Sequence, residues 1–259
     1  MVVEIAAHIA ATSPHPMEDI RSLRATCQAM HAACKEGVVG SSVALEREES
    51  MRWFDHDRYL ALVRNLAAAG NPEACFVLGL TLVFAQQRCT APTGTEWLRR
   101  AAAAGHKVAA YVLGVLHYHY GDKEAERYIR QVEGEAASDG DIAHGCKQLA
   151  SGRTNRECVR CRSQAVQAVR DVTWKVDGMM VPVPVPVPAP AEEGGQGCKG
   201  SGCGVPEGWA GGCAVFCSDG CRTRHEYSEF FSRVSVTCYL EERANGDINL
   251  YKTNPPVPK

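Results

Sequence analysis

The chain has 259 residues, of which 45% are hydrophobic, and a formal net charge of -2. This composition is enough for a sizeable core, and the charge excludes a general attraction to nucleic acid or anionic membranes. The N-terminus has no basic region and no apolar run approaches the thickness of a bilayer, so we expect neither a signal peptide nor a membrane span. Thirteen cysteines without an export signal indicate free thiols or metal ligands, and a cytoplasmic and/or nuclear location.

Residues 1–34 carry two sets of apolar residues at three- and four-residue steps, which predicts two short helices. Between the sets, residues 12–16 contain two prolines and predict a break, because proline biases its predecessor away from helix. Residues 35–52 are predicted to be irregular. Their charged run, 46–49, is expected to be a solvated face.

Residues 53–150 contain an internal repeat. The segment 67–79 returns as 102–114, with eight identical residues all offset by 35 positions. A fixed offset of this size is typical of stacked helical hairpins, each of which buries its apolar face against its neighbours. The sequence therefore predicts an all-α fold with a short α-solenoid at its centre, and a protein that holds partners.

The repeated glycines have two predicted roles. Gly70 is expected to end one helix in the left-handed conformation, with Asn71 and Pro72 as the N-cap and first residue of the next helix. Gly79 and Gly114 fall inside predicted helices, where glycine costs about 1 kcal/mol relative to alanine. Their return at one register predicts close contacts between helices.

The rest of the chain divides into four segments. Residues 151–180 are predicted to form a helix that caps the solenoid. Residues 181–197 alternate valine and proline and then become glycine-rich, which predicts an extended linker whose polyproline part spans about 30 Å. Residues 198–238 hold six of the thirteen cysteines, and residues 239–259 are expected to be a disordered tail.

Two local pairs of cysteines in 198–238 have the arrangement of a structural zinc site, in which four ligands surround one ion. The predicted ligands are Cys198, Cys203, Cys217 and Cys221. Ser218 or Asp219 is expected to cap a helix that runs from Arg222 toward Phe231 and places Cys221 on its first turn. Cys213 or His225 is near enough to replace one ligand.

A bound zinc ion can contribute on the order of 10 kcal/mol to the folding of such a small module. The alternative is a set of free cysteines in a linker and tail, which would leave the paired spacing without an explanation. Cys158 and Cys161 also have metal-like spacing, but no partner pair is evident, so we interpret this spacing as incidental.

The repeats resemble the Sel-like branch of tetratricopeptide-type repeats, whose units read as alanines, a glycine, an alanine and a leucine–glycine pair; residues 67–138 carry this pattern. Residues 2–10 and 17–30 are similar to an F-box, in which an aliphatic-Glu-Ile helix precedes Asp-Leu/Ile, Leu-Arg and a cysteine. The leucine–proline pair that opens an F-box would precede Met1. Residues 216–222 are similar to the later cysteine pair of MYND-type zinc fingers, which implies one ion rather than two.

This order of segments resembles a group of plant F-box proteins, and residues 1–48 would be the F-box-like part. The resemblance implies a substrate-recruiting subunit of a Skp–cullin–F-box ubiquitin ligase, in which the concave face of the repeats binds a protein target. The residues expected to pack on the Skp adaptor are Ile5, Ile9, Ile20, Leu23 and Cys27. From the pattern alone, the same segment would be a helical hairpin that caps the solenoid.

Three other functions are alternatives to a ubiquitin-ligase subunit. A helical-repeat scaffold with a structural zinc ion and no ubiquitin role is the main alternative. Nucleic-acid binding through Arg222, Arg224 and Arg233 is disfavoured, because acidic residues lie among them. An enzyme is disfavoured because there is no glycine-rich phosphate loop or nucleophile elbow, and the nine histidines are scattered.

Overall fold

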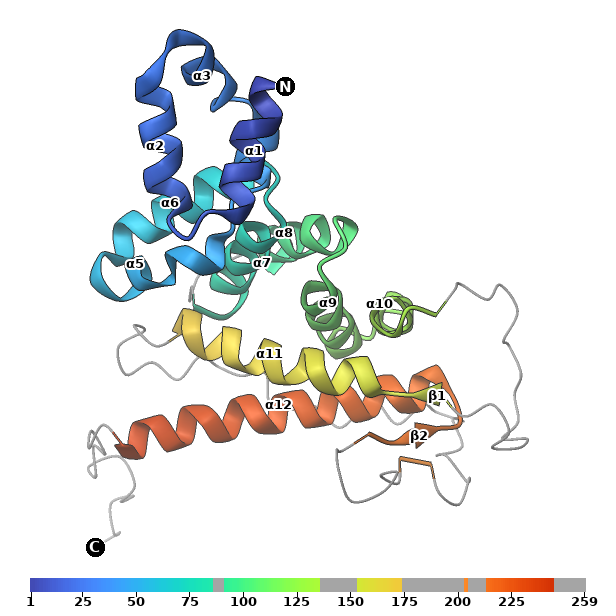
Figure 1. Ribbon diagram of the computed structural model, residues 1–259. Helices are drawn as coiled ribbons and strands as arrows, with labels where there is room; N and C mark the ends of the chain where they lie inside the picture. Colours follow the sequence, from blue (N-terminus) through green and yellow to red (C-terminus); the bar gives the residue numbers. More distant parts are fainter. Residues whose placement is uncertain (86–90, 136–152, 174–202, 205–212, 245–259) are drawn as a thin grey trace, which may run out of the picture.

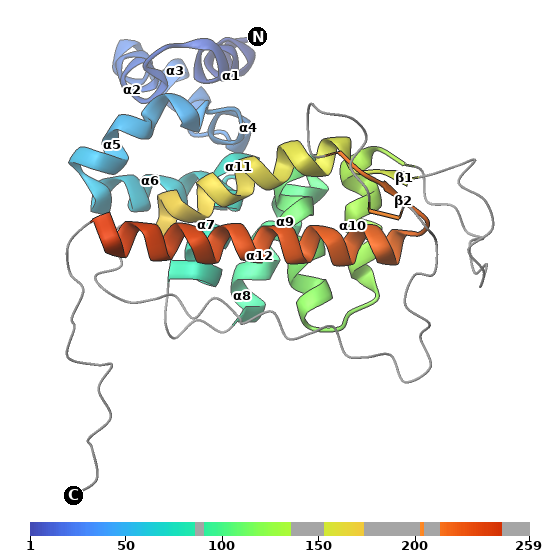
Figure 2. The same cartoon turned by 90° about the horizontal axis from the view of Figure 1, so that it is seen from below.

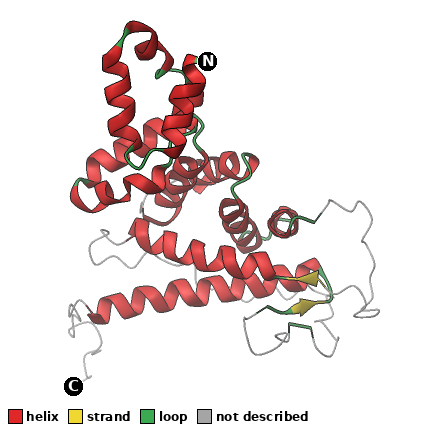
Figure 3. Ribbon diagram, viewed as in Figure 1, coloured by secondary structure: helices red, strands yellow, loops and turns green. Residues whose placement is uncertain are grey.

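The computed structural model describes residues 1–85, 91–135, 153–173, 203–204 and 213–244. These residues are almost wholly helical, with one short antiparallel ribbon of two strands, which confirms the all-α prediction (Figures 1 and 3). The predicted polyproline linker, the last copy of the repeat and residues 245–259 of the predicted tail lie outside the described residues, whereas residues 239–244 of that tail are helical and end α12. Within the described part, no helix is both long enough and apolar enough to cross a membrane.

The N-terminal unit consists of four short helices, α1 (Val2–Thr12), α2 (Pro16–Thr26), α3 (Gln28–Ala33) and α4 (Gly37–Ser41). The predicted break after residue 12 is confirmed, and Pro16 opens α2, where its missing N–H is no loss. Ala6 and Ala10 are fully buried, so α1 lies close to its neighbours. Figure 1 shows this unit at one end of the molecule, beside the first repeat helices.

Residues 35–52 are not irregular, and that prediction is wrong. They form α4, a 3-10 helix η1 (Leu45–Glu48) and the start of α5 (Glu49–Phe54). The charged run is also more than a solvated face: Arg47 donates hydrogen bonds to the carbonyls of Thr12 and Ser13, and Glu48 accepts one from the Met17 N–H at 3.1 Å. These bonds hold α1 and α2 against η1, which leads into α5 and the repeats.

The repeats form paired helices that match the predicted pattern closely. They are α6 (His56–Ala68), α7 (Pro72–Leu80) with a π-helical extension η2 (Thr81–Ala85), α8 (Ala91–Ala103), α9 (Lys107–His119) and α10 (Glu124–Glu133). Gly70 and Gly105 are left-handed, with φ of +87° and +91°, as the sequence predicts. Asn71 caps α7 by accepting from the Ala74 N–H, and His106 caps α9 by accepting from Ala109, both at 3.0 Å.

The two glycines inside the helices confirm the predicted close contacts. A Cβ atom on Gly79 would lie 2.8 Å from Leu98 Cγ, and one on Gly114 would lie 2.9 Å from Ile129 Cδ1. Each glycine therefore lets the first helix of a pair, α7 or α9, approach the second, α8 or α10.

The C-terminal part returns to the repeats. It contains β1 (Arg153–Thr154), α11 (Arg156–Thr173), β2 (Val215–Phe216) and α12 (Asp219–Ala244). β1 and β2 pair antiparallel, and this ribbon brings the starts of α11 and α12 together. Figure 2 shows the two helices side by side across α7, α9 and α10.

The helix predicted to start near Arg222 begins at Asp219 and continues to Ala244, beyond the expected Phe231. The sequence predicts a separate zinc-binding module over residues 198–238. In the structure, Phe230 of α12 instead contacts the ring of Tyr111 on α9 at 6.0 Å and that of Phe84 at 6.4 Å. The start of α12 and the repeats therefore share one core.

Candidate functional site

Three of the four predicted zinc ligands lie together at the N-terminus of α12. The Sγ atoms of Cys203 and Cys217 are 3.6 Å apart, those of Cys217 and Cys221 are 3.5 Å apart, and all three atoms lie within 4.8 Å of one another. A tetrahedral zinc ion with Zn–S bonds of about 2.3 Å separates its sulfur ligands by about 3.8 Å. The spacing therefore suits three thiolates around one ion.

The backbone holds these cysteines in place. Cys217 follows β2 directly, and its N–H donates to Cys203 Sγ at 3.4 Å. Ser218, one of the two predicted caps, accepts from the Cys221 N–H at 3.2 Å, so Cys221 lies on the first turn of α12. The positive end of a helix favours a thiolate over a thiol.

The other sequence-predicted ligands are not part of this cluster. Cys198 lies outside the described residues. Cys213 and His225 do not join the three sulfur atoms in the part of the chain that the structure describes, and the His225 ring contacts Phe216 with centroids 5.0 Å apart. Cys158 and Cys161 are buried in α11, where burial raises the pKa of Cys161 to about 11, so both stay protonated thiols at neutral pH.

The five residues expected to bind the adaptor do not share one environment. Ile5 is 44% exposed and Cys27 is also exposed, while Ile9 and Leu23 are half-buried and line a shallow depression of about 330 Å³ between α1 and α2. Ile20 is only 7% exposed and packs inside the helical unit, so it stabilises the unit instead of facing a partner. Val38, 52% exposed, was missed by the sequence analysis.

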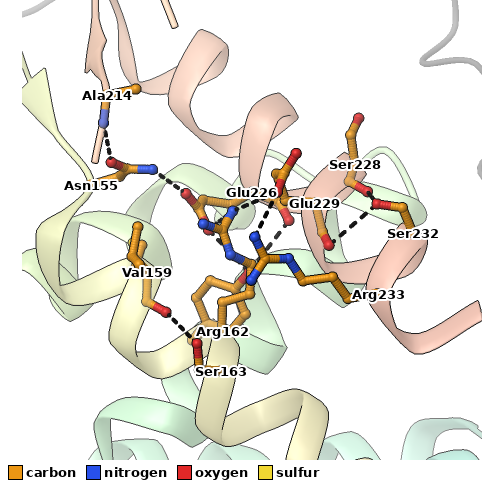
Figure 4. Close-up of polar contacts among 12 residues, drawn as sticks. Asn155, Val159, Arg162, Ser163, Ala214, Glu226, Ser228, Glu229, Ser232 and Arg233 are labelled. Atoms are coloured by element: carbon orange, nitrogen blue, oxygen red, sulfur yellow. Dashed lines mark hydrogen bonds and ion pairs between the residues drawn. The ribbon is translucent and has the colours of Figure 1, made fainter. Parts of the chain in front are cut away.

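A buried polar network, which the sequence analysis did not anticipate, fastens α12 to the repeats and to α11 (Figure 4). At its centre Glu226 of α12, fully buried, accepts hydrogen bonds from Asn155 at 2.6 Å and from the Tyr111 hydroxyl at 3.1 Å. Arg162 of α11 is also buried, and its Nη1 lies 3.3 Å from Glu226 Oε2 as an ion pair without hydrogen-bond geometry. Burial, followed by the Glu226 charge, raises the pKa of Tyr111 well above its ordinary value.

A second buried arginine adds to this network. Arg222 donates to both carboxylate oxygens of Glu135 at 2.8 and 2.7 Å, to the Thr154 carbonyl at 2.9 Å and to Asp219 at 2.7 Å. These bonds hold together the end of α10, strand β1 and the start of α12. Since Arg222 is 0% exposed, it cannot contact a phosphate, which removes one of the three arginines considered for nucleic-acid binding.

The packing of α11 and α12 changes the expected location of the target. Residues 109–116 of α9 are all buried, and the side of α7 and α9 that faces α11 and α12 is covered by the chain itself. This side of the repeats is therefore closed to a partner, so a target of the repeats has to bind elsewhere on them. Buried aromatic side chains on α12 fill the space that a groove on this side would offer.

The comparisons with known proteins agree with the helical repeats. Residues 46–170 match a family model described as plant tetratrico peptide repeats, a range that extends from the last residues of η1 through α5 into α11. The tetratricopeptide-type prediction is confirmed. The matched range also includes most of α11, which the sequence analysis had placed after the repeats as a capping helix.

One curated relative comes from Arabidopsis thaliana and is named "Putative F-box protein At1g67623". It is 28% identical over 181 residues, which are 70% of this chain and 55% of the relative. The chain thus spans about half the length of that relative. No solved structure matches the chain. Helical repeats together with a relative of this name support a protein-interaction adaptor.

Proposed function

We propose that this chain is a substrate-recruiting F-box subunit of a Skp–cullin–F-box ubiquitin ligase, acting in the cytoplasm and/or the nucleus. The observation that carries the proposal is that α1 and α2, in the segment that resembles an F-box, leave Ile5 44% exposed and Ile9 and Leu23 half-buried at a surface depression, in a chain related to a protein with an F-box name. Apolar side chains that a fold leaves exposed on one unit mark a site of protein–protein contact.

The N-terminal unit would dock on the Skp adaptor through Ile5, Ile9, Leu23 and Cys27. The contacts of Arg47 and Glu48 with α1 and α2 would then hold the repeats at a fixed position relative to the adaptor. A target bound by the repeats would then be held in one orientation relative to the cullin complex, as a substrate-recruiting subunit requires.

The test is co-purification of this chain with a Skp-type adaptor. The wild-type chain should retain the adaptor, and Ile5→Asp and Leu23→Asp should each weaken retention at least about tenfold, since interface centres carry most of the binding energy. Tyr120→Asp is a matched control, because Tyr120 is also exposed but lies at the end of α9. A folded wild-type chain that does not retain the adaptor would leave the scaffold without a ubiquitin role as the function.

We also propose one structural zinc ion at the N-terminus of α12, bound by Cys203, Cys217, Cys221 and, as predicted from the sequence, Cys198. The sulfur spacing of the three described cysteines supports it. The ion would supply no chemistry beyond structure: it would tie β2 and the start of α12 to the loop that carries Cys203. This site is independent of the ligase role.

Metal content and cobalt substitution test the zinc site. Purified chain should contain one zinc per molecule by mass spectrometry, and the cobalt form should show the charge-transfer absorption of thiolate ligands. Cys221→Ser and Cys198→Ser should both reduce this absorption, whereas Cys158→Ser, a buried cysteine outside the cluster, should leave it unchanged. Zinc-free purified chain that folds normally contradicts the site, and a loss with Cys213→Ser in place of Cys198→Ser would correct the fourth ligand.

A further inference from the structure

A cleft lies where three parts of the molecule meet. It is bounded by η1 and α5, by the repeat helices α6, α7 and α9, and by α11, and its volume is about 580 Å³. This volume is within the range of about 300–1,000 Å³ that ligand-binding clefts usually have. The floor is apolar and nearly inaccessible, and includes Leu45, Tyr59, Phe76 and Leu80.

The rim of the cleft is acidic. Glu46 and Glu49 are exposed, and within the described residues neither side chain forms a hydrogen bond or an ion pair. Glu73, whose side chain is 43% exposed, holds His106 at 2.8 Å, and Asp171 holds Arg52 at 3.3 Å. Four carboxylates therefore face one arginine and one histidine, so the opening of the cleft carries a negative charge.

The guanidinium group of Arg52, at the edge of the cleft, has one N–H donor without a hydrogen-bond acceptor among the described residues. The side chain is only 10% exposed, and this donor is its Nε. A buried donor of this kind is costly to leave unpaired. A backbone carbonyl of a peptide lying in the cleft would supply the acceptor after a small turn of the guanidinium.

We propose that this cleft binds an extended segment of a partner protein that carries an arginine or a lysine. The aliphatic stem of such a side chain packs on apolar surface while its charged end stays near water and carboxylates. Val77, Val108 and Val172, which line the cleft and are partly exposed, provide the surface for the stem, and Glu49 and Glu73 lie at the rim for the charge. In the proposed adaptor, this segment would belong to the target protein. Binding at the cleft does not itself require the ligase role.

Labelled peptide pools of random sequence around one fixed central residue test this proposal on the purified full chain. Pools centred on Arg or Lys should bind about threefold more tightly than a pool centred on Gln, and a pool centred on Glu should bind least. Added salt should reduce the difference, because the rim carboxylates are exposed. Equal binding of the four pools, or no binding of any, contradicts the proposal.

Substitutions at the rim locate the binding. The double variant Glu46→Gln with Glu49→Gln should remove most of the preference for basic pools without affecting the fold, because both side chains are exposed. Glu124→Gln is the matched control, since this exposed glutamate lies on α10 and does not line the cleft. A preference that survives the double variant, or that falls equally in the control, overturns the proposal. Retention of the Skp adaptor is measured separately and should be unchanged in both variants, so the two proposals fail independently.

Discussion

The two ends of the chain use their side chains in opposite ways. At the N-terminal end, α1–α4 leave apolar groups such as Ile5 and Val38 about half exposed and bury mainly small residues such as Ala6 and Ala10. At the C-terminal end, the described side chains of α12 place Phe230 and Phe231 in the core at 0% exposure and bury the charged Glu226 as well. The N-terminal end leaves apolar surface accessible to a partner, whereas the apolar side chains of α12 are buried against the repeats.

This difference in exposure between the two ends determines where a partner can bind. A short solenoid needs its open faces covered, and α11 with α12 covers the side of α7 and α9 that a groove-binding protein would otherwise use. The surfaces that stay accessible include the N-terminal helices, α5, where Phe54 is 90% exposed, and the cleft beside α11. The charge network under α12 also specifies one position for that helix, because buried charges are tolerated only where they are paired.

The largest expected effect comes from breaking the buried network. Glu226→Ala removes the buried counter-charge of Arg162, which keeps only the partly exposed Glu229 at 3.6 Å, and leaves the hydroxyl of Tyr111 without its carboxylate acceptor. We expect the free energy of unfolding to fall by about 3–5 kcal/mol, the usual cost of an uncompensated buried charge. Urea unfolding of the purified chain measures this loss.

Glu229→Ala is the control on the same helix. Glu229 pairs with Arg233 at 3.1 Å and with Arg162 at 3.6 Å, but its side chain is 38% exposed. Water screens such pairs, so the expected loss is below about 1 kcal/mol. Similar losses for the two variants would mean that α12 is not fixed by a buried charge and that the contrast between the two ends is weaker than described.

The repeats between the two ends provide the next largest effect. Gly79→Ala places a Cβ 2.8 Å from Leu98 Cγ and 3.1 Å from the Gly94 carbonyl oxygen, so α7 and α8 have to separate. Overpacking of this kind costs about 1–3 kcal/mol, partly offset by the better helix propensity of alanine. Gly37→Ala is the matched control, because its Cβ would meet nothing within 4 Å. Thermal unfolding should show a lower Tm for the first variant only.

A smaller, pH-dependent effect is expected where α10 meets α12. The hydrogen bonds from Arg222 hold the pKa of Glu135 below its ordinary value of 4.5. Because the folded pKa is lower than the unfolded one, this contribution to stability is complete above about pH 4.5 and is lost as the pH falls through the folded pKa. Glu135→Gln should therefore be less stable than wild type at neutral pH, by less than about 1 kcal/mol because the carboxylate is partly exposed, with a gap that closes in acid. A gap that widens in acid would contradict the cause given for the shift.

The smallest effect on stability is expected at the open end. Ile5→Asp, which is expected to weaken adaptor retention, should change the free energy of unfolding by no more than about 0.5 kcal/mol, because the side chain is already 44% exposed. Ile20→Asp should cost several times more, since it buries an unpaired carboxylate inside the N-terminal unit. Equal costs would show that Ile5 is part of the core.

Local features of the repeats could be predicted because a local cause determines each of them. Gly70, Asn71 and Pro72 end one helix and start the next through their own backbone and capping preferences. Gly79 recurs as Gly114 because each glycine lets its helix pack closely against the second helix of its pair. The cysteine spacing likewise brought Cys217 and Cys221 together through a single capped turn. The 35-residue offset of the repeats and the short turn between Cys217 and Cys221 can be read from the sequence, because neither depends on contacts between distant residues.

Long-range contacts could not be predicted. The bond from Tyr111 to Glu226 joins residues 115 positions apart, and nothing near Glu226 indicates that a glutamate there would be buried. The charged run around Arg47 looked solvated because its acceptors, the carbonyls at the end of α1, are backbone atoms that any sequence provides. The cleft was missed for the same reason, since its walls come from three separate segments.

Amide hydrogen exchange resolved along the chain tests most directly the claim that α12 closes the repeats. In the full chain, the amides of residues 109–116 and 226–234 should be the slowest to exchange, and Glu226→Ala should speed both segments together because they belong to one cooperative core. The amides of α1–α3 should exchange faster and remain unchanged in that variant. Fast exchange in α12 alongside slow exchange in α9 would show that the helix is detached, and that the repeats present an open face to partners after all.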